Sequence, residues 1–221
     1  MQAIMETLFD IVYLSTVITL GVTMLRRAKT RQHRLFGAMA VVLGCGDAFH
    51  LVPRAWALCT TGLADYTAAL GIGKLVTSVT MTVFYLILYY VWRERYAVAG
   101  KKGLTAAVWA LAAARILLCL CPQNEWTSAQ PPLSWGVLRN IPFAALGLVI
   151  IVLFFSRTRG GRDPSFRWLW LTIVLSFGFY IPVVLFADTI PPVGALMIPK
   201  TCAYVWAVAI GYRDMKRSLV K

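Results

Sequence analysis

Seven apolar segments run through the chain, each about 17 to 25 residues long and so able to cross roughly 30 Å of hydrocarbon. They lie near 5–25, 35–58, 67–92, 103–121, 134–156, 166–187 and 192–212. Composition agrees, because 59% of the residues are hydrophobic and 14% are charged, whereas a typical globular protein has about 25% charged residues. The sequence therefore predicts an all-α fold: a polytopic membrane protein in which residues 1–221 form one seven-transmembrane-helix bundle.

The connections between these segments alternate in charge. Seventeen of the 22 Lys and Arg lie in RRAKTRQHR (26–34), RERYAVAGKK (93–102), RTRGGRDPSFR (157–167) and RDMKRSLVK (213–221). The three other connections, CTTGLADYT, CPQNEWTSAQPPLSW and ADTIPP, have none. By the positive-inside rule we expect the N-terminus outside and the C-terminus in the cytoplasm of a multi-pass cell-membrane protein. Bases gathered in loops rather than on one face do not indicate a nucleic-acid partner.

The remaining five bases lie inside the apolar segments, each within about three helical turns of the predicted outer surface. They are Arg54, Lys74, Arg115, Arg139 and Lys200, on five different helices. Three acids, Glu6, Asp10 and Asp47, fall in the same layer. Ionised groups are costly in hydrocarbon, so this common level predicts a polar chamber in the outer half of the bundle.

Helical spacing places several of these residues on shared faces. Glu6, Asp10 and Tyr13 follow i, i+4, i+7 spacing, and Asp47, His50 and Arg54 follow i, i+3, i+7 spacing. Lys200 and Tyr204 share a face of the last helix, and Asn140 stands beside Arg139. We expect these residues to line the chamber.

A purely structural interpretation stays open for single residues. Arg54 and Arg139 lie near the interface, where a long side chain can snorkel to water, and Asp47 could simply neutralise a base. Loop acids Asp65, Glu125 and Asp188 could also supply negative charge. Yet five bases outnumber the three acids within the segments. The surplus predicts a pocket for an anionic or zwitterionic ligand, such as a lipid head group.

Several chemistries are disfavoured. A retinal protein would use Lys200 for its Schiff base, but the third helix has no acid to serve as counterion, and Leu196 stands where microbial rhodopsins have Asp. The five cysteines and two histidines show no zinc-ligand spacing, and no G-x-S-x-G occurs. We therefore expect no metal and no cofactor. A disulfide between Cys59 and Cys119 or Cys121 is chemically possible, although buried free thiols are more usual.

The stretch LGCGDAFHLVPR (43–54) resembles the G-D-A-x-x-L-x-P-R segment of the YhhN lysoplasmalogenase-like family, whose members include vinyl-ether hydrolases. ALGIGKLVTS (69–78) is loosely similar to the Gly-led helix that follows it in that family. The resemblance implies that Asp47 is a catalytic carboxylate. Thr77 stands where the family has a histidine, the family's Ser-Asp pair has no counterpart, and the family tends towards eight spans.

Two functional hypotheses follow. In the first, the protein is an intramembrane lipid hydrolase, with Asp47 as general acid or base and His50 as its proton partner. In the second, it is a small-anion transporter or a ligand-binding receptor, and the prolines between the last two segments provide a movable or broken element. In both, the partner is a membrane lipid or small anion bound by the charged residues named above. The oligomeric state is left open.

Overall fold

The computed structural model describes residues 2–187 and 189–220, and every regular element in these ranges is helical. The long helices are α1 (Gln2–Arg27), α2 (Arg31–Cys59), α3 (Thr67–Arg95), α4 (Lys102–Leu120), α5 (Leu133–Thr158), α6 (Leu169–Phe186) and α7 (Met197–Val220). Four 3-10 helices lie between them: η1 (Leu63–Tyr66), η2 (Pro122–Asn124), η3 (Arg159–Gly161) and η4 (Pro191–Leu196). The seven long helices are long and apolar enough to cross a membrane, which confirms the predicted multi-pass bundle.

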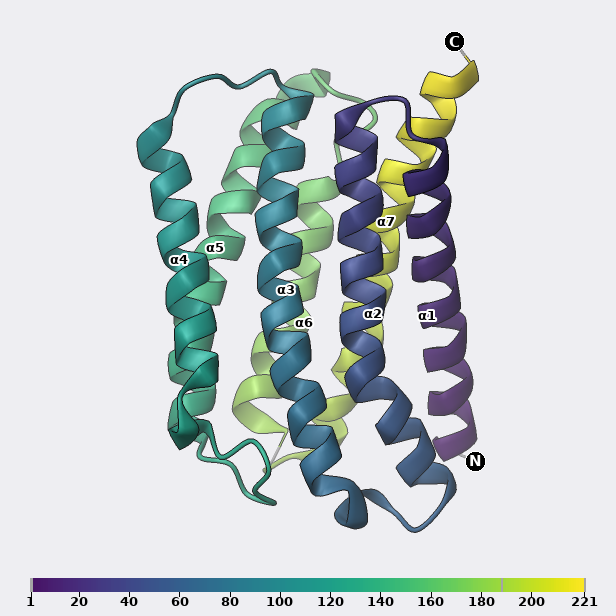
Figure 1. Cartoon of the computed structure of the whole chain (residues 1–221), viewed down its shortest axis with the longest axis vertical. Coiled ribbons are helices and arrows are strands. Elements are labelled where there is room, and N and C mark those ends of the chain that lie inside the picture. The colour runs from purple at the N-terminus through teal and green to yellow at the C-terminus, as the bar shows by residue number, and fades with distance from the viewer. Residues whose placement is uncertain (1, 188, 221) are drawn as a thin grey trace.

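The helices form a closed ring in which each packs on the next and α7 returns to α1. Figure 1 shows them running along one common direction, with the two chain termini at opposite ends. Helix α3 is the most buried of the seven. Its aromatic side chains Phe84, Tyr85 and Trp92 form much of the core.

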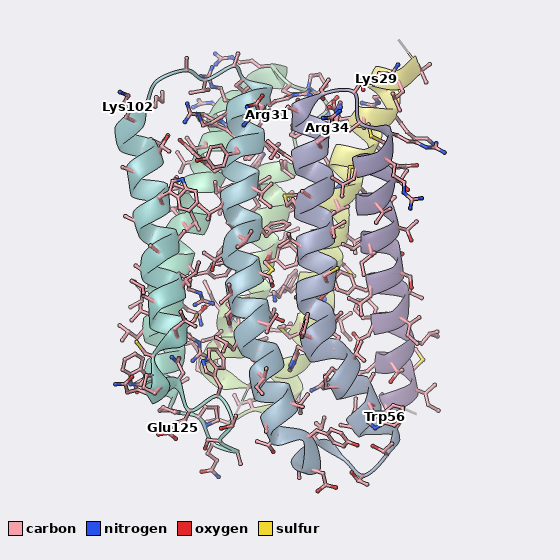
Figure 2. All side chains as sticks on the ribbon, in the orientation of Figure 1. Lys29, Arg31, Arg34, Trp56, Lys102 and Glu125 are labelled. Carbon is pink, nitrogen blue, oxygen red and sulfur yellow. The ribbon has the colours of Figure 1, made fainter. Side chains whose placement is uncertain are left out.

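The two ends of the bundle differ in charge. Figure 2 shows Lys29, Arg31, Arg34 and Lys102 at one end, and Trp56 and Glu125 at the other. We call the first the basic end; it carries the α1–α2, α3–α4 and α5–α6 connections and the end of α7. We call the second the opposite end; α1 begins there.

Several helices extend further than their apolar segments. The predicted basic connection 26–34 shrinks to residues 28–30, and α7 runs through the predicted tail to Val220. Lys and Arg are good helix formers, and positive charge is favourable at the C-terminal ends of α1 and α7. Thr30 then starts α2, because its hydroxyl accepts a hydrogen bond from the His33 backbone N–H at 3.3 Å.

A close approach between α2 and α3 depends on one proline and one glycine. Pro53 lies inside α2 and has no N–H, so the Phe49 carbonyl one turn earlier loses its usual helical partner. Gly73 of α3 packs against that carbonyl so closely that a Cβ there would lie 2.4 Å from the oxygen. The most extensive helix contact in the bundle therefore requires a residue without a side chain at position 73.

Gly73→Ala tests this contact. The added methyl would also lie 2.7 Å from the His50 Cα, so backbone must move, and we expect a loss of about 1–3 kcal/mol in the free energy of unfolding. Gly178→Ala is the matched control, since no atom lies within 4 Å of a Cβ at that helical position. Unfolding by SDS titration in mild detergent measures both; equal stability of the two variants would contradict the packing described.

Candidate functional site

Asp47 lies on α2 between residues from two other helices. The Tyr13 hydroxyl of α1 donates a hydrogen bond of 2.6 Å to Asp47 Oδ2. The Lys200 ammonium of α7 is close enough to interact electrostatically with the carboxylate, but the two do not form an ion pair within 4.0 Å. We call these three residues, together with Tyr180 and Tyr204, whose rings lie beside the Lys200 ammonium, the Asp47 site.

Lys200 is held by aromatic rings instead of by a contacting carboxylate. Its Nζ lies 4.8 Å from the Tyr180 ring centroid and 5.5 Å from that of Tyr204. The residue is only 9% exposed, and cation–π contacts of this kind are strongest where water is excluded. A separated ammonium and carboxylate inside an aromatic enclosure can hold a group that carries the complementary charges.

A shallow apolar groove of about 230 Å³ runs between α1 and α7 beside the Asp47 site. It is lined by Phe9, Val12, Tyr13, Thr16, Cys202 and Val205. Val12 and Cys202 are exposed, so the groove opens on the outer surface of the bundle. Tyr13 belongs to both features, because it is one of the residues that line the groove and its hydroxyl donates to Asp47.

Nearer the opposite end of the bundle, the polar faces predicted for α1 and α2 lie against each other. Arg54 Nη2 and Glu6 Oε2 form an ion pair at 2.9 Å. Asp10 lies within electrostatic range of Arg54, Glu6 and Asp47. The acids of α1 thus continue the Asp47 site towards the end of the bundle, and Arg54 has an internal partner.

His50 faces α3. Its Nδ1 lies 3.2 Å from the Leu70 carbonyl, so this nitrogen is the donor of that hydrogen bond. The structure places no direct hydrogen bond between His50 and Asp47, which accepts a hydrogen bond from Tyr13 and interacts electrostatically with Lys200. Lys74, one turn further along α3, is exposed. His50 and Lys74 therefore lie beside the Asp47 site and outside its hydrogen bonds.

The other three predicted residues form a second group on α4 and α5. Arg115 Nη1 donates to the Asn140 side-chain oxygen at 2.8 Å and to the Arg139 carbonyl. The Tyr180 hydroxyl donates to the same Asn140 oxygen at 3.2 Å. Tyr180 thus joins the two groups, since its ring also contacts Lys200. Asn124 also belongs to this group, because its side-chain oxygen accepts a hydrogen bond from Arg139 at 2.8 Å. Helical spacing in the sequence did not predict Tyr180 or Asn124 as site residues.

Sequence reasoning also missed a charged cluster at the basic end. The Arg95 guanidinium of α3 binds both Asp163 oxygens at 2.9 Å and Asp214 at 2.8 Å. Asp214, on α7, lies 3.0 Å from His33 Nε2 of α2. We call Arg95, Asp163, Asp214 and His33 the basic-end cluster. A sequence signal existed, since Asp163 and Asp214 are two of very few acids among seventeen bases.

Tyr96 completes this cluster at the first residue after α3. Its hydroxyl donates to Asp163 at 2.9 Å. Burial, and then the adjacent Asp163 carboxylate, raise the pKa of Tyr96, so the phenol stays protonated and keeps donating. The cluster ties α2, α3, α7 and the α5–α6 connection together.

All five cysteines are free thiols; Cys119 is buried, and Cys45, Cys59 and Cys202 are exposed. Within residues 2–187 and 189–220, no three His, Cys, Asp or Glu side chains gather in a way that could hold a metal ion.

No family model, curated protein or solved structure matches the chain. Function therefore has to be inferred from the chemistry of these residues.

Arg95→Met tests the basic-end cluster. The substitution leaves the nearly buried Asp163 without a cation and Asp214 with His33 alone, and we expect it to reduce the free energy of unfolding by about 3 kcal/mol. Arg31→Met removes an exposed ion pair with Glu94 and should cost less than about 1 kcal/mol. SDS titration compares them, and equal costs would show that the cluster is not a main support of this end.

Proposed function

We propose that the protein binds a single-chain anionic or zwitterionic amphiphile from the bilayer. The apolar chain lies in the groove between α1 and α7, and the head group lies between Asp47 and Lys200. The observation that carries the proposal is the double role of Tyr13, which lines the groove and donates to Asp47. A ligand that is apolar at one end and charged at the other matches a site with that polarity.

Charge supports a head group at this position. Asp47 and Lys200 are close but separated, so a negative group can contact the ammonium while a positive one contacts the carboxylate. Tyr180 and Tyr204 surround the ammonium with rings, which suits a partly dehydrated ligand. The nearby Arg54 has Glu6 as its partner.

The reaction that this site offers is lipid hydrolysis, with Asp47 as general acid or base. A vinyl ether would take a proton on carbon from the carboxyl group, and water would then add to the oxocarbenium ion and return a proton to the Asp47 carboxylate. The C–O bond of the resulting hemiacetal would then break, giving an aldehyde and an alcohol. The Tyr13 hydrogen bond fixes the orientation of the carboxyl group. His50 lies outside the hydrogen bonds of Asp47, and its Nδ1 donates to the Leu70 carbonyl.

Binding and turnover are tested separately. Native mass spectrometry of the gently extracted protein should show a retained single-chain lipid. We expect this lipid to be lost in Lys200→Gln and in Cys202→Trp, which fills the groove, and kept in Lys102→Gln at the basic end. Retention of the same lipid by all four proteins would overturn the site.

A lysoplasmalogen supplied in nanodiscs then tests hydrolysis. We expect the wild type to release a long-chain aldehyde, and Asp47→Asn to slow the release by about 100-fold or more without unfolding the protein. If the wild type retains the lipid but releases no aldehyde, the hydrolysis proposal is rejected and the binding proposal stands. Movement of the amphiphile between leaflets, without product, would favour a transporter; η4, a tight 3-10 turn just before Lys200, is the element that such movement would use.

We further propose that the chain lies in the cell membrane with its basic end in the cytoplasm. The support is the concentration of Lys and Arg at that end. A single-cysteine protein that keeps only the exposed Cys59 should react with an impermeant maleimide in intact cells. A protein whose single cysteine is Gly103→Cys should react only after permeabilisation. The reverse pattern would invert the orientation.

A further inference from the structure

Arg115 and Arg139 stand out because every described partner of their guanidinium groups is neutral. Arg115 is 1% exposed, and its Nη1 binds the Arg139 carbonyl and the Asn140 side-chain oxygen. Its Nε is buried and has no hydrogen-bond partner. A buried donor left without an acceptor is destabilising, and more so where it is charged.

Arg139 points towards the same region from α5. Its Nη1 donates to the Asn124 side-chain oxygen at 2.8 Å, and its guanidinium lies 4.2 Å from the Trp126 ring centroid. The two guanidinium groups repel each other electrostatically. Cation–π contacts, including one of 4.6 Å between Arg115 and Phe143, reduce the cost of burial but leave the positive charge in place.

Most described carboxylates are engaged elsewhere, and Glu125, which lies between Asn124 and Trp126 in the sequence, forms no ion pair with either arginine. Glu6 binds Arg54, Asp47 lies beside Lys200, and Asp163 and Asp214 bind Arg95 at the basic end. Within residues 2–187 and 189–220, no carboxylate forms an ion pair with either arginine; Asp188, one of the three loop acids named above, lies outside the described residues. Of the bases in this half without a carboxylate partner within 4.0 Å, Lys74 is exposed, whereas Arg115 is buried and Arg139 is half-buried.

We propose that Arg115 and Arg139 form a binding site for an oxyanion of the phosphate type, distinct from the Asp47 site. A buried cation is stable in low dielectric only with a counter-charge, and two guanidinium groups present planar forks of donors that suit phosphate oxygens. The free Nε of Arg115 supplies a donor that the protein does not use. Asn140 and Asn124 hold the two forks in place through their side-chain oxygens.

Two sources can supply this chemistry: free phosphate and the phosphate of a lipid head group. Arg115 lies five residues before the end of α4, and Arg139 lies six residues after the start of α5. At 1.5 Å per residue these positions are about 8–9 Å from the helix ends, a depth that both a dissolved anion and a lipid head group can approach.

The first arm uses inorganic phosphate added to delipidated protein in detergent, at constant ionic strength with gluconate as the replacement anion. We expect the thermal unfolding midpoint of the wild type to rise with the logarithm of the phosphate concentration. Arg139→Gln, which is only half-buried and retains a donor, should lose the rise, as should Arg115→Met if it folds. Arg31→Gln, at the basic end, should keep it.

The second arm uses native mass spectrometry of protein reconstituted with phosphatidylglycerol. A phospholipid retained by the wild type and by Arg31→Gln, but lost in Arg139→Gln, identifies the lipid as the source even if free phosphate has no effect. An equal response of all variants in both arms, or no response by any of them, overturns the proposal. Lys200→Gln should respond like the wild type in both arms, which separates this site from the amphiphile site.

Discussion

A charged side chain inside an apolar bundle is stable only where other groups replace the water it has lost. The chain meets this requirement in three ways. Arg54 uses an ion pair with Glu6, and Asp47 uses a tyrosine hydroxyl together with a nearby ammonium. Arg115 has only amide oxygens and an aromatic ring. These differences in partner, more than the number of charges, distinguish an internally balanced residue from one that needs a ligand.

Backbone packing determines where these charges can lie. Pro53 leaves the Phe49 carbonyl unpaired, and Gly73 lets α3 approach it. In the same region His50 donates a hydrogen bond to the Leu70 carbonyl of α3 and makes none with Asp47. One segment of α2 thus combines a helix-packing surface with residues of the proposed binding site on its other face. This explains in part why a stretch that looks catalytic in sequence contains residues with unrelated roles.

The seven helices could be predicted because a 30 Å apolar length is a strong, local signal. The shared face of Lys200 and Tyr204 on α7 was also accessible, since spacing along a helix defines faces. The separation of Arg115 and Arg139 from Asp47 was not accessible, because it depends on which helices are neighbours in the ring. Tyr180 and Asn124 were missed for the same reason: their role comes from contacts across helices, not from spacing within one.

Helix α7 carries Lys200 near one end and Asp214 near the other, about 21 Å apart along a continuous rod. Lys200 contributes to the Asp47 site, whereas Asp214 is bound by Arg95 and His33. If α7 pivots as a rigid body to widen the space around Lys200, its far end must shift against those two side chains. Binding of the proposed ligand near Lys200 would then change the strength of the ionic contacts at the basic end, because one rigid helix carries both sets of residues.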